Sequence, residues 1–411
     1  MSKTFIADKE TLDKVYSILA SDEVYGFIEH NATLAPGQRI EYIGANKNFN
    51  PITVTKGGGY SLGDWADFPV LVANKPWMVR SDGTPDYRLK EDNYAYKEDG
   101  TTASDVANTS YNGGAFSWLM KIYKQEYMVG TDRVVKFSFR KRDGFEAVGF
   151  IDPDGNELEG VWIPMFYGTI IDGTMKCISG NQPDYSKTTE VQKAAIDKFG
   201  SRAKFLGGPI VETITDLLLM WGKDCNIESV YGYGNHSGYD SSLTPTMGVK
   251  QNAVVGGGQF YGTSDGKSLN KILHSIVLGS WQQWMRDPYT LCVNGKVKVS
   301  KNYSYDLTGA SYEDTGISYP ETVSGTYPHE FRTVPGFGAL PTFPYKGSSI
   351  TGGCDGFWVN VGITAVALRF GPCCHGSLCG SRALALDRTA AFANWAIGCA
   401  VLLLPPVGVA A

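Results

Sequence analysis

The chain lacks the features that would place it in several common classes. It has no cluster of lysine and arginine interleaved with aromatic residues, and its formal net charge is -5 with a pI near 5.6. This charge balance gives no large positive field, so we expect no nucleic-acid partner. Residues 1–19 contain neither an apolar signal-peptide core nor a small-residue cleavage site, so we expect synthesis and folding in a cytoplasm.

Cysteines follow no disulfide framework. The chain has 8 of them, scattered without regular spacing. Free thiols are the usual state in a cytoplasm, so we expect no disulfide. Cys373, Cys374, His375 and Cys379 stand close together, but adjacent cysteines rarely chelate one ion, and no second Cys-x-x-Cys or His pair follows. We therefore expect neither a metal nor a cofactor.

One long uncharged run ends the chain. Residues 392–411 carry no charge, and this length could span a bilayer. Pro405 and Pro406 would break a helix there, and no basic residue follows to anchor it. We expect no membrane insertion, but a buried terminal strand followed by an exposed apolar end.

The length and the amino-acid composition of the chain favour a β-rich protein of two domains. The 411 residues are too many for one ordinary core, and 49 Gly with 23 Tyr indicate many turns and strands. A polar, glycine-bearing segment at residues 97–114 marks the expected boundary. We therefore predict an α+β protein with a small β-rich domain over residues 1–112 and a second domain over residues 113–411. Paired strands are expected over 117–128 and 133–145, and helices over 188–200 and 211–222.

The last 55 residues differ in composition from the rest. Across residues 357–411 there is no Lys, Glu, Gln or Met, although these four make up roughly one residue in six before it. Replacing the adenines of an Asn codon yields Phe, Leu, Ser, His, Arg, Asp and Cys among others, but never these four residues. The amino-acid composition of this segment is therefore the one expected if the adenines of its codons had been randomised.

The stretch LRFGPCCHGSLCGSRALALDRTAAFANWAIGC, residues 368–399, resembles the variable region of proteins diversified by retroelements. In that family a reverse transcriptase copies a template with errors at adenines and installs the copy at the 3′ end of the gene. The frame of this pattern consists of Leu368, Arg369, Gly371, Gly376, Cys379, Gly380, Ser381, Leu384, Leu386, Ala390, Asn394, Trp395, Ile397 and Gly398. Upstream, residues 137–169 and 217–235 resemble gut-phage tail and receptor-binding proteins.

The resemblance implies a C-terminal C-type lectin fold of the formylglycine-generating-enzyme type, with a variable region at about residues 368–402. Frame residues such as Trp395, Ile397 and Gly398 would be core. The intervening positions would face solvent and the ligand. These expected ligand-binding residues are Phe370, Cys373, Cys374, His375, Ser377, Arg382, Asp387, Arg388, Phe392 and Ala396, with Pro372, Leu378, Ala383 and Ala385 as a second group.

Two functions follow from this resemblance. The first is a phage tail receptor-binding protein without catalysis. It would be part of the virion, bind a bacterial surface receptor of protein or glycan, contact other tail proteins through its N-terminal domain, and act as a homotrimer. The alternative is an enzyme, because the fold class includes formylglycine-generating copper oxidases that use two cysteines. We favour the first, because the close cysteines here lie in or beside positions expected to vary.

Overall fold

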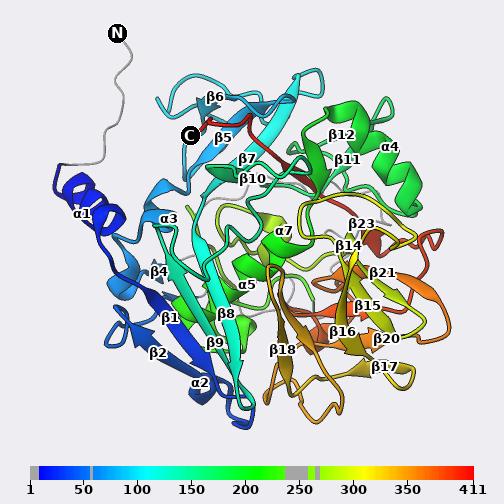
Figure 1. Cartoon of the computed structure of the whole chain (residues 1–411). Helices are drawn as coiled ribbons and strands as arrows, with labels where there is room; N and C mark the ends of the chain where they lie inside the picture. Colours follow the sequence, from blue (N-terminus) through cyan, green and yellow to red (C-terminus); the bar gives the residue numbers. More distant parts are fainter. Residues whose placement is uncertain (1–8, 56–58, 237–257, 264–268) are drawn as a thin grey trace.

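The computed structural model describes residues 9–55, 59–236, 258–263 and 269–411 (Figure 1). The protein is a mixed α/β structure with more strand than helix. Its helices are α1 (Lys9–Ala20), α2 (Pro36–Arg39), α3 (Pro69–Ala73), α4 (Thr189–Phe199), α5 (Pro209–Gly222), α6 (Ile227–Tyr231) and α7 (Ile276–Gly279), with 3-10 turns at Gly63–Trp65 and Gly376–Leu378.

Strands fall into three larger sheets and several two-stranded pairs. The strands of the first two sheets are β1 (Tyr25–Glu29), β2 (Ile40–Gly44), β5 (Pro76–Arg80), β6 (Pro85–Arg88), β7 (Gly113–Met120), β8 (Tyr123–Val129), β9 (Asp132–Ser138), β10 (Gly160–Pro164), β13 (Ala203–Phe205) and β24 (Val401–Leu403). Those of the third are β14 (Trp284–Val293), β15 (Lys296–Val299), β16 (Glu313–Ser318), β17 (Val323–Thr326), β20 (Phe357–Val359), β21 (Thr364–Arg369), β22 (Leu384–Leu386) and β23 (Ile397–Gly398). The pairs are β3 (Thr53–Val54) with β4 (Tyr60–Ser61), β11 (Thr169–Ile171) with β12 (Thr174–Lys176), and β18 (Phe331–Val334) with β19 (Gly338–Pro341).

The strand orders show how distant parts of the chain meet. The four-stranded sheet runs β2-β1-β9-β8, and the six-stranded sheet runs β13-β24-β10-β7-β5-β6. The eight-stranded sheet runs β16-β15-β14-β21-β22-β20-β17, with β23 paired in parallel to β14. The segment that the sequence marks as variable therefore supplies β22 and β23 to the last sheet and β24 to the second.

The expected boundary near residue 112 does not separate two cores. β1 pairs with β9 along its whole length, and β5 pairs with β7. One hydrophobic cluster contains buried residues from both sides of the boundary, among them Phe27, Trp65, Trp162 and Trp221. Residues 1–112 and 113–411 therefore do not form two separate cores, because the polar segment at 97–114 leads from β6 into β7, which lie on either side of β5 in one sheet.

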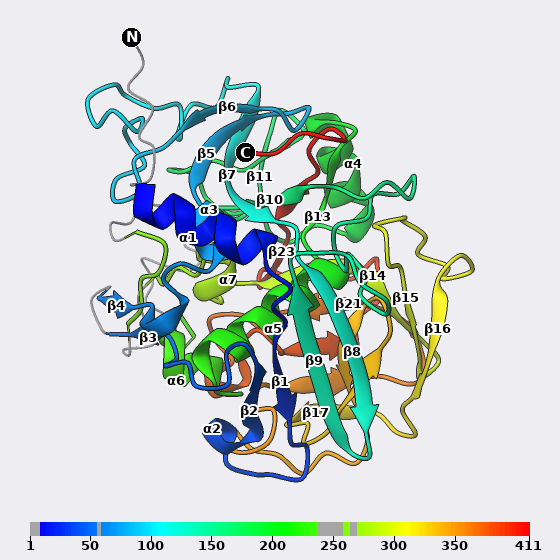
Figure 2. The same cartoon turned by 60° about the vertical axis from the view of Figure 1, so that its left-hand side comes forward.

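Helix α5 lies near the centre of the molecule in both views (Figure 1, Figure 2). The helix covers the range 211–222 that the sequence predicts, and all 14 of its residues are buried, not only the expected Leu/Met/Trp face. Two of them are acidic, and each meets a buried arginine: Glu212 Oε1 lies 2.6 Å from Arg369 of β21, and Asp216 Oδ1 lies 2.6 Å from Arg133 of β9. These ion pairs connect the central helix to both of the sheets that flank it.

The uncharged C-terminal run forms a strand of the six-stranded sheet. β24 pairs with β13 and with β10, and residues 396–405 are buried. Beyond this point the chain becomes exposed, with Val407 at 57%. The prediction of a buried strand and an exposed end is confirmed. Within the described residues, no helix has both the length and the apolar character needed to cross a bilayer.

Candidate functional site

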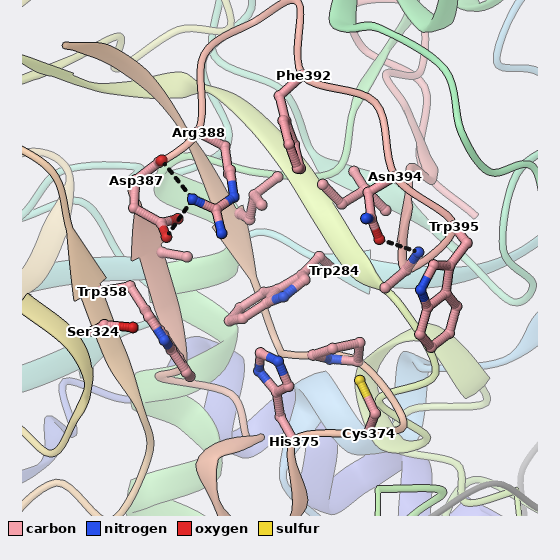
Figure 3. Close-up of a pocket in the computed structure, with 15 residues that line it drawn as sticks. Trp284, Ser324, Trp358, Cys374, His375, Asp387, Arg388, Phe392, Asn394 and Trp395 are labelled. Atoms are coloured by element: carbon pink, nitrogen blue, oxygen red, sulfur yellow. Dashed lines mark hydrogen bonds and ion pairs between the residues drawn. The ribbon is translucent and has the colours of Figure 1, made fainter.

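A pocket of about 350 Å³ opens at one end of the eight-stranded sheet (Figure 3). Strand residues form its floor, and the segments at residues 372–375 and 387–396 form its rim. The lining residues are Trp284, Ser324, Trp358, Leu368, Pro372, Cys374, His375, Ala385, Asp387, Arg388, Phe392, Asn394, Trp395, Ala396 and Ile397.

Five of the fifteen residues that line the pocket carry aromatic rings. The indoles of Trp284 and Trp358 are perpendicular, with ring centroids 5.2 Å apart. The His375 ring lies 5.3 Å from Trp358 and 5.6 Å from Trp284. Figure 3 shows Trp284 in the middle of the group, with Trp358 on one side and Trp395 on the other. Edge-to-face contacts of this kind are favourable for aromatic pairs and hold the rings in fixed orientations.

Charged side chains in the pocket wall cancel one another. Arg388 Nη1 lies 3.0 Å from Asp387 Oδ2 and donates to the Asp387 carbonyl at 3.1 Å. The same guanidinium lies 4.9 Å from the centroid of the Phe392 ring, a cation–π contact. Burial raises the pKa of Asp387, and Arg388 opposes this rise. Burial lowers the pKa of His375, so its ring is neutral near pH 7.

The rim segment at residues 387–396 is held through its main chain. Its carbonyls accept hydrogen bonds from donors outside the segment, and these donors are backbone N–H groups or one arginine. The contacts run from Ser186 N to Asn394 O (3.0 Å), Thr189 N to Ala390 O (2.9 Å), Val366 N to Arg388 O (2.9 Å), Trp284 N to Ala396 O (2.8 Å) and the Arg286 side chain to Phe392 O. Every residue has a backbone carbonyl, so side chains in this segment can be replaced without loss of these hydrogen bonds or of the backbone conformation that they hold.

The segment at residues 370–380 is anchored in the same way. Cys373 N donates to Gln282 O at 3.2 Å, and Gly376 N donates to His236 O at 2.8 Å. Gly371 belongs to the expected frame, and the structure gives a reason: its φ is +88°, and a Cβ there would lie 2.7 Å from Cys379 Sγ. Only glycine fits this position without strain.

Six of the ten expected ligand-binding residues line the pocket, namely Cys374, His375, Asp387, Arg388, Phe392 and Ala396. From the second group, Pro372 and Ala385 also line it, Leu378 is half-buried, and Ala383 is buried. Ser377 is exposed outside the pocket wall, with its hydroxyl 3.2 Å from that of Tyr327.

For three of the expected ligand-binding residues the prediction of a solvent-facing side chain is wrong, because these side chains are buried in the protein. Phe370 is 2% exposed, since its left-handed backbone (φ +76°) at the end of β21 turns the ring into the core. Cys373 is 0% exposed, and Arg382 is 7% exposed. Ala396 is also buried, at 6%, and meets the pocket only with its small side chain.

Arg382 is held by a partner that no local pattern reveals. Its guanidinium nitrogens lie 2.7 and 2.8 Å from the two carboxylate oxygens of Glu29 in β1. Glu29 is fully buried and also contacts Arg39 and Arg133. Burial alone would raise the pKa of Glu29, but Arg382, Arg133 and Arg39 outweigh it and hold the pKa well below its usual range. Position 382 therefore stabilises the fold, although it lies in the segment expected to vary.

Trp395 was expected in the core, and this prediction is wrong. The residue is half-buried and lines the pocket, whereas its neighbours Ile397 and Gly398 are buried in β23 as expected. Sequence reasoning also missed Trp284, Trp358 and Ser324, which reach the pocket from strands outside the variable segment. Nothing in the sequence distinguishes these two tryptophans from core tryptophans.

Two of the three close cysteines are buried: Cys373 and Cys379 lie inside the protein, whereas Cys374 is exposed. Burial raises the pKa of Cys373 to about 12 and that of Cys379 well above its usual range. The Cys379 thiol donates to the Pro372 carbonyl at 3.2 Å. All eight cysteines are free thiols, and the described part of the chain holds no group of three or more His, Cys, Asp or Glu side chains placed to bind a metal.

No family model and no curated protein matches this chain.

Proposed function

We propose that this chain is a phage tail receptor-binding protein that binds a bacterial surface ligand in the pocket between β14, β20 and the rim at residues 387–396. One observation carries the proposal. Six of the ten positions that the sequence singles out as variable meet in this single pocket. The rim that carries Arg388 and Phe392 is anchored by contacts to its main chain, so different side chains can occupy one backbone.

In finer detail, we propose a C-type lectin fold of the formylglycine-generating-enzyme type for the C-terminal part, with residues 368–402 diversified by a retroelement. The absence of Lys, Glu, Gln and Met after residue 356 supports this history. The DNA downstream of the gene tests it directly. A near-copy of the final codons with Asn codons at positions 374, 375, 387, 388 and 392, beside a reverse transcriptase gene, is the expected arrangement.

Adsorption of phage carrying this protein to a panel of gut bacteria tests the binding function. Truncating an exposed aromatic residue that contacts the ligand costs about 1 to 3 kcal/mol, so Phe392→Ala should lower adsorption at least about fivefold. Tyr127→Ala is a matched control, since Tyr127 is 38% exposed and Phe392 36%, and each ring carries a cation, Lys136 and Arg388 respectively.

Equal adsorption by the Phe392→Ala phage, the Tyr127→Ala phage and the parent would contradict the proposal. So would equal losses in the two variants, because Tyr127 lies on β8, far along the chain from the pocket. Both residues lie on the surface, so both variants should fold and assemble into particles, and this is checked by particle counts before adsorption is measured.

A further inference from the structure

We infer that the pocket binds a neutral sugar ring, without a metal ion. This inference rests on the proposed adhesion function and names the chemical class of its ligand. Its first support is charge. Asp387 and Arg388 are the charged residues among those that line the pocket, and they pair with one another at 3.0 Å. An anionic or cationic ligand would have to compete with this pair, whereas a neutral ligand can hydrogen-bond to both members and leave it intact.

The second support is the shape of the aromatic wall. A sugar ring has a face of C–H groups that packs against a flat aromatic surface, and hydroxyls around its edge. The pocket offers such surfaces in Trp395 and in Phe392 at the rim, beside the buried, perpendicular pair Trp284 and Trp358 (Figure 3). Phe392 is 36% exposed and Trp395 half-buried, so a ligand can cover apolar area on both that now meets water.

The third support is the set of polar groups between these rings. Ser324 offers a hydroxyl, Asp387 a carboxylate, Arg388 a guanidinium and Asn394 an amide. Asn394 accepts from Ala396 N at 2.9 Å through Oδ1, and its Nδ2 group provides two further donors. A purely apolar ligand would strip water from these groups without replacing its hydrogen bonds, and would bind weakly for that reason. Hydroxyls both donate and accept, so they match this mixture.

The fourth support is size. Small-molecule pockets span about 300 to 1,000 Å³, and this one, at about 350 Å³, lies at the lower end. It admits one or two sugar rings. A protein ligand covers about 800 Å² of each partner, most of it on flatter surface than this pocket. The geometry therefore favours the sugar over a protein loop.

Titration of the full chain with a panel of neutral methyl glycosides tests the inference. The panel comprises glucose, galactose, mannose, rhamnose, N-acetylglucosamine and N-acetylgalactosamine, each in EDTA and up to about 20 mM. Tryptophan fluorescence and saturation-transfer NMR report binding. We expect at least one glycoside to bind with a Kd of about 0.1 to 10 mM. The methyl glycoside of sialic acid, which is anionic, should bind at least about tenfold more weakly.

Two pocket variants locate the binding. Trp395→Ala and Asp387→Asn should each weaken it about tenfold or more. Trp77→Ala is the control for fluorescence, because Trp77 is likewise half-buried but lies on β5 of another sheet. If no neutral glycoside binds, if binding requires a divalent cation, or if both pocket variants bind as well as the parent, the inference is overturned.

Treatment of host cells separates this inference from the proposed function. Periodate oxidation of the cell surface should abolish adsorption, and protease treatment should leave it. If adsorption survives periodate and is lost with protease, the adhesion function stands with a protein receptor and the sugar inference fails. If Phe392→Ala leaves adsorption to untreated cells unchanged, the adhesion function itself fails.

Discussion

Replacing Arg382 by alanine should destabilise the protein by about 3 kcal/mol. The Arg382 side chain is 4% exposed, and its two nitrogens contact the Glu29 carboxylate, which is 0% exposed. Removing one member of a buried ion pair costs about 3 to 5 kcal/mol, since the other charge remains buried. Glu29 keeps Arg39 at 3.2 Å and Arg133 at 3.0 Å, which places the expected loss at the lower end.

Urea unfolding followed by tryptophan fluorescence measures this loss, with Arg388→Ala as the matched control. Arg388 also lies in the variable segment and also has an ion pair of 3.0 Å, but its side chain is 46% exposed. Exposed pairs contribute about 0 to 1 kcal/mol, so the control should lose less than about 1 kcal/mol. Equal losses in the two variants would refute the assignment of Arg382 to the fold and Arg388 to the binding surface.

The pH dependence of the Arg382→Ala deficit is a second readout. The folded-state pKa of Glu29 lies well below its usual value near 4.5. Stability from this group is therefore present above about pH 4.5 and is lost as the pH falls further, because the unfolded chain takes up the proton first. Without Arg382 the folded-state pKa moves back toward the unfolded value. The difference between parent and variant should shrink once the pH falls below the folded-state pKa of Glu29 in the variant, where the variant alone binds the proton in both states, and a difference that grows there would contradict the reasoning.

Four further predictions concern stability, its pH dependence, thiol labelling and the oligomeric state. Trp284→Ala should cost about 3 to 5 kcal/mol in urea unfolding because the ring is 6% exposed, whereas Trp395→Ala should cost much less; the reverse order would contradict the observed packing. Burial raises the pKa of Glu228 to about 9 and the group lies 3.0 Å from His236, so stability should fall as pH rises from 7 to 9, and Glu228→Gln should remove this slope. A thiol reagent should label one cysteine of the native chain, Cys374, since the other seven are buried; rapid labelling of more would show that the loop at 370–380 opens. Light scattering should give a homotrimer, because weak single sites gain avidity of about 10² to 10⁴ when carried in several copies; a monomer that binds cells tightly would contradict this.

Local patterns in the sequence predict much of the secondary structure. The apolar period and the terminal glycine predict α4, where Thr188 caps the helix by accepting from Val191 N. The runs over 117–128 and 133–145 predict the β8–β9 pair in part, since the first run also includes the end of β7 and β9 ends at Ser138. The division near residue 112 fails because the pairing of β1 with β9 joins residues more than 100 positions apart, and sequence patterns carry no information on such pairing.

The candidate site shows the same limit. The resemblance of residues 368–399 to a retroelement-diversified variable region implies that the rim residues Asp387, Arg388 and Phe392 face a ligand, and these residues line the pocket. It also singles out Arg382, whose role depends on Glu29, a partner 353 residues away. The resemblance gives no indication of Trp284 in β14 or Trp358 in β20, because both lie before the expected variable region at residues 368–402. Whether a residue of this segment is buried against a distant partner can be seen only in the folded structure.

Exchange of the whole rim tests the central claim most directly. Cys374, His375, Asp387, Arg388 and Phe392 are replaced together by a different set of side chains, and phage carrying the parent or the exchanged protein are adsorbed to the same panel of gut bacteria. The account predicts that the set of bacteria bound changes, while the unfolding transition and particle assembly stay as in the parent. An unchanged host range with an intact, correctly assembled protein would contradict it.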